Sequence, residues 1–129
     1  KTELINIIDE IEHPSVRECL RFLEIHQGIE INYIGDLPAG TGLGSSSSFT
    51  VGLLNALHSL KGDKVSKDRL AEEAVYVEQK LIEERVGVQD QYTCAIGGLV
   101  HLKFETNGKI KISNIHLNKK RFEISLKLN

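Results

Sequence analysis

A run of three glycines and four serines within residues 37–48 is the feature that most constrains how this chain can fold. The run lies between an apolar segment with strand-like character and a longer one with helical periodicity. Glycines let backbone N–H groups approach a ligand closely, and a helix that begins at the serines adds its positive N-terminal end. We therefore predict a phosphate-binding loop, which points to a nucleotide. A flexible turn before a serine-capped helix is the simpler alternative.

The spacing of the glycines excludes two common phosphate-binding motifs. A P-loop needs a lysine directly before its serine or threonine, and no lysine lies between Thr41 and Leu60. A dinucleotide fingerprint needs G-x-G-x-x-G, whereas the three glycines here are spaced by two throughout. Ser45 or Ser46 would cap the helix, and a serine hydroxyl there can also bind magnesium. The loop residues that we expect to contact the nucleotide are Pro38, Gly40, Gly42, Leu43, Gly44, Ser45, Ser46 and Ser47.

Apolar periodicity predicts an α+β domain with a helical layer on one face of a mainly antiparallel sheet. The predicted helices span 14–26, the serines to Gly62-Asp63, a stretch after the N-cap Ser66 as far as Leu81, and a short stretch through Cys94 and Ile96. The predicted strands span 30–36, 99–104, 109–115 and 122–128, with a hairpin turn at Asn107-Gly108. Residues 4–11 are predicted to form a strand or an irregular lead-in.

Composition narrows the class of protein. The 129 residues suffice for a single domain with a real core, and the net charge of −2 argues against a nucleic-acid surface. No apolar run approaches the roughly 20 residues of a membrane span. We expect Cys19 and Cys94 to be free thiols in a reducing, cytoplasmic compartment. The chain begins at Lys1 and contains no methionine, so we expect it to be a piece of a larger protein.

The segment from Leu37-Pro38 to Ser48 resembles the signature of the GHMP kinases, the superfamily of galactokinase, homoserine, mevalonate and phosphomevalonate kinases. The resemblance implies ATP as phosphoryl donor, Mg²⁺ as cofactor and a ribosomal-protein-like N-terminal domain over residues 1–129. It also implies an N-terminal strand with a basic residue and a C-terminal domain, both absent from these residues. We therefore expect little or no turnover from this chain alone.

Two acids follow where the family carries its own. Glu78 lies on the third predicted helix, and Asp90 follows twelve residues later, ahead of Gly97-Gly98. The resemblance implies that Ser46 and Glu78 hold Mg²⁺ and that Asp90 acts as the catalytic residue on the substrate hydroxyl. Phosphoryl transfer needs charge neutralisation and a carboxylate that accepts the hydroxyl proton. Taken alone, Glu78 is better explained as a solvated surface acid than as a metal ligand, and Asp90 alone is also explained as a turn or cap residue.

Several stretches, including Gln89 to Tyr92, are most similar to the branch of heptose 7-phosphate kinase and fucokinase. That branch implies a sugar or sugar-phosphate substrate, phosphorylated at the anomeric hydroxyl, with substrate contacts from Gln89, Gln91 and Tyr92. A non-catalytic nucleotide- or metabolite-binding module derived from such a kinase is the main alternative. An RNA-binding domain is a third, which the lack of a basic stripe disfavours. The oligomeric state is not predicted.

Overall fold

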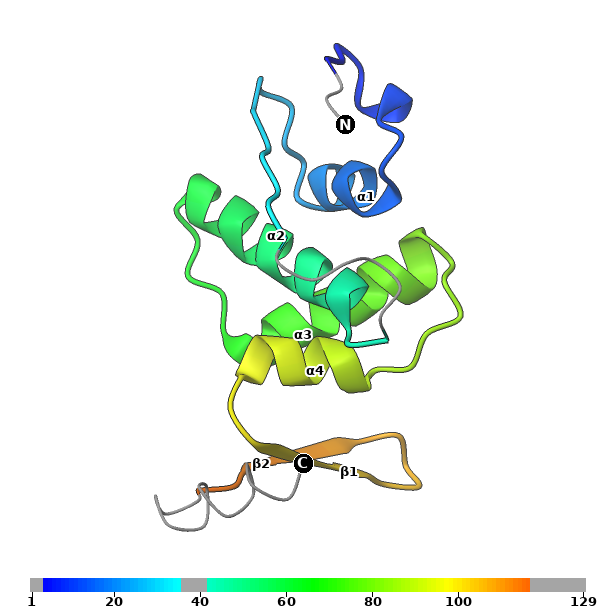
Figure 1. The fold of residues 1–129 in the computed structure, drawn as a ribbon, viewed down its shortest axis with the longest axis vertical. Coiled ribbons are helices and arrows are strands. Elements are labelled where there is room, and N and C mark those ends of the chain that lie inside the picture. The colour runs from blue at the N-terminus through cyan, green and yellow to red at the C-terminus, as the bar shows by residue number, and fades with distance from the viewer. Residues whose placement is uncertain (1–3, 36–41, 117–129) are drawn as a thin grey trace. The chain divides into compact units, whose positions relative to one another are not determined.

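The computed structural model describes residues 4–35 and 42–116. The chain divides into two compact units, Lys1–Ile96 and Gly97–Asn129, which are described separately. The first unit contains η1 (Ile8–Glu10, a 3₁₀ turn), α1 (Pro14–Phe22), α2 (Ser45–Lys61), α3 (Lys67–Tyr76), η2 (Val77–Leu81, a π-helical turn) and α4 (Gln89–Ile96) (Figure 1). The second contains the antiparallel strands β1 (Val100–Phe104) and β2 (Ile110–Asn114). These elements confirm the α+β class.

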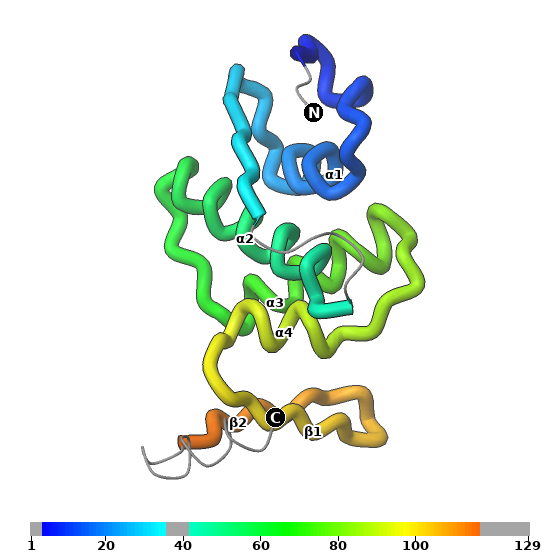
Figure 2. Tube along the Cα trace, viewed as in Figure 1, coloured from blue at the N-terminus to red at the C-terminus, as the bar shows by residue number. Residues whose placement is uncertain are grey.

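Helix α2 is the centre of the first unit, since α1, α3 and α4 all contact it (Figure 2). Its inner face contributes Leu54 and Leu57, which are almost fully buried. Burial of each such leucine contributes about 1.5–3 kcal/mol. From α3 and η2, the buried residues Leu70, Ala74 and Val77 complete this core, as their spacing predicts. The position of α2 therefore fixes where its N-terminal serines lie.

Several predicted boundaries are confirmed by hydrogen bonds. The Ser66 hydroxyl accepts from the N–H of Arg69 at 3.3 Å and caps α3. Gly62 ends α2 in the left-handed conformation, with φ of 79°. In the second unit, Gly108 has φ of 80° in the turn between β1 and β2. Those strands pair in one register, with Leu102 opposite Ile112.

Other predicted elements are wrong. Helix α1 ends at Phe22 rather than at residue 26, because Glu24 takes a left-handed conformation with φ of 53°. Residues 30–35 form no strand, since no strand among the described residues pairs with them. Instead, Tyr33 packs edge-on against Phe49 of α2, with ring centroids 4.8 Å apart. By contrast, residues 4–11 are irregular apart from η1, which agrees with one of the two predicted alternatives. The predicted strand 122–128 lies outside the described residues.

Candidate functional site

The N-terminus of α2 begins without a side-chain cap. Its N-cap residue is Gly44, which has φ of 72° and no side chain, so the predicted cap by Ser45 or Ser46 is wrong. The helix already begins at Ser45, and the first N–H that bonds within it is that of Ser48, to Gly44 O at 2.9 Å. The preceding N–H groups are therefore available to an anion, which the helix dipole also favours.

Asp90 lies against this helix terminus. A Cβ atom added to Gly44 would stand 3.3 Å from Asp90 Cγ and 3.4 Å from Asp90 Oδ2. The positive φ of Gly44 and this contact both favour glycine at the position. Asp90 is exposed in the first turn of α4. A carboxylate open to solvent thus stands beside the predicted phosphate-binding loop.

Glu78 is buried next to the same helix end, with 1% of its surface exposed. The Ser47 hydroxyl donates to Glu78 Oε2 at 2.9 Å, and the Gln91 carboxamide donates to the same oxygen. Glu78 Oε1 is buried without a hydrogen-bond partner, and no described cationic side chain pairs with it. A buried carboxylate without a positive partner is costly. The arrangement is therefore suited to a cation.

The backbone at Glu78 is unusual. Residues 77–81 form a π-helical turn, in which the N–H of Ile82 bonds to Val77 O at 2.9 Å. Single π-turns occur frequently at functional sites. Here the turn carries the Glu78 side chain inward, so the interpretation of Glu78 as a solvated surface acid is wrong. Sequence periodicity gave no sign of this turn.

The structure brings together only part of the predicted set. It pairs Glu78 with Ser47, whereas Ser46 is exposed and its carbonyl accepts from Thr50 at 3.3 Å. Gln91 and Tyr92 are buried and Gln89 is exposed, so only Gln89 of the three is open to a dissolved substrate. Gly42 shares the left-handed φ of 72°, and Leu43 is 67% exposed. Pro38 and Gly40 lie outside the described residues.

Two cysteine thiols near the acids of this region have raised pKa values. Both are free. Burial, with the charges of Glu78 and Glu18, raises the pKa of Cys19 to about 12. Burial and the charge of Asp90 raise the pKa of Cys94, while a hydrogen bond with Ser48 lowers it. Both thiols are therefore protonated at neutral pH.

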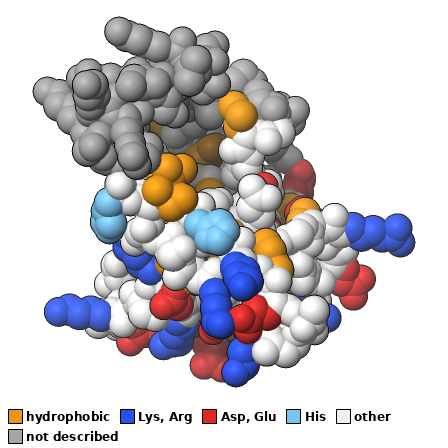
Figure 3. All heavy atoms as spheres, turned by 90° about the horizontal axis from the view of Figure 1, so that it is seen from below, with side chains coloured by type: hydrophobic (Ala, Val, Ile, Leu, Met, Phe, Trp, Pro, Cys, Tyr) orange, Lys and Arg blue, Asp and Glu red, His pale blue; other side chains and the backbone are white. Residues whose placement is uncertain are grey.

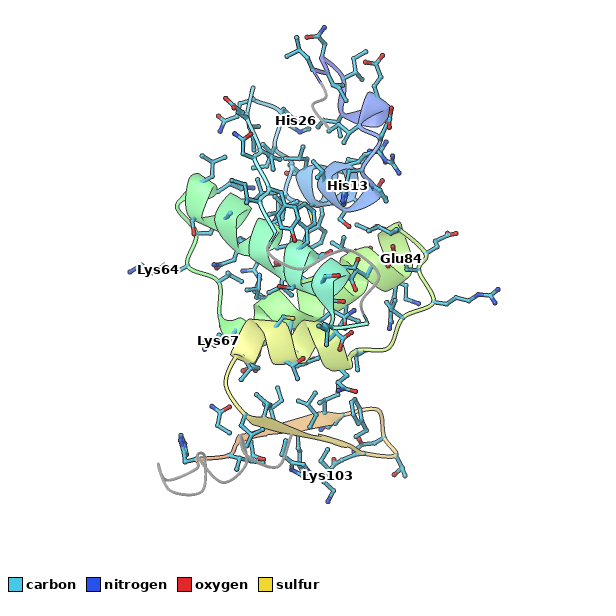
Figure 4. All side chains as sticks on the ribbon, in the orientation of Figure 1. His13, His26, Lys64, Lys67, Glu84 and Lys103 are labelled. Atoms are coloured by element: carbon cyan, nitrogen blue, oxygen red, sulfur yellow. The ribbon has the colours of Figure 1, made fainter. Side chains whose placement is uncertain are left out.

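An open cavity of about 360 Å³ lies between α2, α3 and α4. Its lining includes Ser48, Asn55 and Cys94, together with Lys67, which is labelled in Figure 4. The Lys67 ammonium already donates to Ile96 O at 2.6 Å. Neither Glu78 nor Asp90 lines this cavity, so it is distinct from the site that these two acids form at the α2 N-terminus.

The described residues contain no group of three or more His, Cys, Asp and Glu side chains that could hold a metal ion. Mg²⁺ does not need such a group, because it accepts one or two protein oxygens together with phosphate oxygens and water. Glu78 with a serine hydroxyl fits that pattern, and the unpartnered Oε1 supplies a free ligand atom. Within the described ranges, no helix has both the length and the apolar composition of a membrane span.

Comparison with known proteins identifies the family. Residues 3–98 match the model of the GHMP kinases N-terminal domain, so the chain belongs to the GHMP kinase family. It is 35% identical over 113 residues to homoserine kinase from Clostridium botulinum, a match that covers 82% of this chain and 35% of that protein. It is 28% identical over 82 residues to D-glycero-alpha-D-manno-heptose 7-phosphate kinase from Campylobacter jejuni, covering 64% of this chain and 24% of the relative.

Among solved structures, the fold is similar to that of a D-glycero-D-manno-heptose 1-phosphate kinase from Bacteroides thetaiotaomicron. The TM-score is 0.72 at 24% identity, over 84% of this chain and 37% of that chain. This likeness shows the N-terminal domain fold. The chain spans between about a quarter and about a third of the length of these relatives.

Proposed function

We propose that this chain carries the phosphate- and metal-binding part of an ATP-dependent kinase that phosphorylates a hydroxyl of a sugar or sugar phosphate. One observation carries the proposal: the uncapped N-terminus of α2 lies between an exposed carboxylate, Asp90, and a buried one, Glu78, that has an unpartnered oxygen. A bare helix terminus attracts phosphate, and two carboxylates in different environments take different roles.

Each residue has a proposed task. The N–H groups that precede Ser48 would bind phosphate oxygens of ATP, with Gly42 and Gly44 allowing close approach. Ser46 and Glu78 would hold Mg²⁺, which supplies charge neutralisation on those oxygens when bound. Asp90, exposed beside the loop, would accept the proton of the substrate hydroxyl as that oxygen attacks the γ-phosphorus. The new bond joins the hydroxyl oxygen to the γ-phosphorus. The bond between the γ-phosphorus and the oxygen that bridges to the β-phosphorus breaks, and ADP leaves.

The sugar class is supported by the kinship with heptose-phosphate kinases, and an anomeric hydroxyl is our specific candidate acceptor. The kinship with homoserine kinase makes an amino-acid hydroxyl the competing acceptor. Protonated free thiols fit a reducing, cytoplasmic location. The face shown in Figure 3 mixes Lys and Arg with Asp and Glu, which is not the pattern of a nucleic-acid surface.

The first test measures the melting temperature of this chain as a function of MgATP concentration. A ligand at about 100 times its Kd stabilises the native state by about 2.7 kcal/mol, so we expect the melting temperature to rise. The variant G44A should lose this shift, because its Cβ meets Asp90 at the helix terminus. A shift that is equal in G44A and wild type would contradict the assignment of this loop.

The second test uses the full-length protein that contains these residues and measures ADP release with heptose 7-phosphate, galactose and homoserine in parallel. Asp90→Asn should lower turnover by about 10²–10⁴-fold and leave nucleotide binding unchanged. Binding without turnover of any acceptor by the wild type would instead identify a non-catalytic module. For this chain alone we expect little or no turnover.

A further inference from the structure

We propose that Gln91 is a positioning residue that holds the Glu78 carboxylate in the orientation in which it meets a divalent cation. The inference rests on the proposed function, since it assumes that Glu78 serves a cation. This role differs from the substrate contact that the sequence predicts for Gln91, because here Gln91 contacts another residue of the protein.

Burial is the first reason. Gln91 has 1% of its surface exposed, although it lies in the first half of α4 next to the exposed Asp90. A carboxamide so placed faces other protein groups rather than solvent. Its amide group instead points to Glu78, thirteen positions earlier in the chain, and donates to Oε2.

The asymmetry of the contacts is the second reason. Both donors that reach Glu78, from Ser47 and Gln91, bind the same oxygen, Oε2. Oε1 remains buried and without a partner, and so does Gln91 Oε1. Buried polar atoms are normally paired, and each unpaired one in a native protein calls for an explanation. Unpaired acceptor oxygens call for a hydrogen-bond donor or a cation, and we infer a cation at Glu78 Oε1 because the partners that Glu78 has among the described residues are neutral.

The choice of residue type is the third reason. Gln91 is neutral, so its N–H donor orients Glu78 without cancelling the charge that a cation needs. A lysine or arginine in its place would form an ion pair with Glu78 and cancel its negative charge. Residues that orient a metal ligand commonly change metal affinity 10–100-fold when replaced. Gln91 also follows Asp90 directly, so one turn of α4 carries both the proposed base and the residue that orients the metal ligand.

The test titrates Mn²⁺ into this chain at a fixed ATP concentration, with water proton relaxation as the readout. Gln91→Met keeps the volume and removes the donor, and we expect the half-saturating Mn²⁺ concentration to rise at least tenfold. Gln79→Leu is the matched control, because Gln79 adjoins Glu78 in sequence but donates to Val86 O at 2.8 Å. It should leave the titration unchanged. In the Glu78→Gln background, Gln91→Met should have no further effect.

The outcomes separate the two ideas. If Glu78→Gln leaves Mn²⁺ binding unchanged, the metal role in the proposed function is wrong. If Glu78→Gln weakens binding tenfold or more and Gln91→Met does not, only the role of Gln91 is overturned. NMR of the wild-type chain gives a second test without any variant. The carboxamide protons of Gln91 should exchange slowly with solvent, and their resonances should shift when Mg²⁺ and ATP are added. Fast exchange would overturn the inference.

Discussion

The two ends of α2 each contact a buried glutamate, and the two glutamates differ in the partners of their carboxylates. Near the C-terminal end, His58 lies 2.6 Å from Glu73 Oε2, and Arg69 donates to Glu73 Oε1 at 2.7 Å. Near the N-terminal end, Glu78 receives only the neutral donors of Ser47 and Gln91, and one of its oxygens has no partner. The two acids are five residues apart in the chain.

The comparison shows how a structural acid differs from a candidate functional one. Both oxygens of Glu73 have nitrogen partners, so it ties α3 to α2 within the protein. Glu78 is buried more deeply and has two neutral partners that share one oxygen, a combination that lowers stability unless a ligand compensates for it. Such local cost at a site is typical where function and stability compete. The difference lies in the partners, not in the residue type.

The largest effect should come from the structural acid. Glu73→Ala removes the carboxylate that lies 2.6 Å from Nε2 of His58, a side chain that is 1% exposed and whose Nδ1 lies 3.6 Å from Asp63 Oδ2. We expect a loss of about 3 kcal/mol of unfolding free energy, measured by urea denaturation. Glu72→Ala, at the exposed neighbouring position, should change stability by less than about 0.5 kcal/mol. Equal effects of the two variants would contradict the structural role of Glu73.

A matched pair of glycines tests the contact with Asp90. Gly42 and Gly44 both have φ of 72°, but among the described residues only a Cβ at Gly44 would come within 4 Å of another residue. Alanine at either position suffers the left-handed strain of about 1–2 kcal/mol. We expect Gly44→Ala to cost roughly 1 kcal/mol more than Gly42→Ala, since an added Cβ at 3.3 Å forces Asp90 aside. Equal stabilities of Gly44→Ala and Gly42→Ala would contradict the close approach of Asp90 to Gly44.

Glu78, the candidate functional acid, should respond with the opposite sign. In buffer that contains a chelator, Glu78→Gln removes an uncompensated buried charge and keeps the shape of the side chain. We expect unfolding free energy to stay constant or to rise by about 1 kcal/mol. The same variant should lose the stabilisation by MgATP. A destabilisation as large as that of Glu73→Ala would erase the distinction between the two acids.

The smallest effect concerns pH. The thiol of Cys19 has its pKa raised from 9.0 to about 12, by burial first and then by the charges of Glu78 and Glu18. Between these values the unfolded chain loses a proton that the native state keeps, so native stability falls as pH rises above 9. We expect Cys19→Ala to remove about 1 kcal/mol of the decrease between pH 8 and pH 10. Parallel pH profiles of variant and wild type would contradict the burial of this thiol.

Sequence reasoning succeeded where the signal was local. The cap at Ser66, the helix stop at Gly62 and the turn at Gly108 each depend on the backbone preferences of a few neighbouring residues. It failed at residues 30–35, because a strand exists only with a partner and alternation alone does not supply one. It also failed at Glu24, since nothing in a glutamate announces a left-handed conformation.

For the site, the sequence alone determined the family, the glycine–serine loop and the two acids twelve positions apart. Only the tertiary structure decided that Ser47 contacts Glu78, that Gln91 is buried, and that Asp90 lies beside Gly44. The physical reason is range. Caps, turns and motif spacing depend on residues that are close in the sequence. The contact between Ser47 and Glu78 spans 31 positions and depends on how α2 packs against η2 and α4.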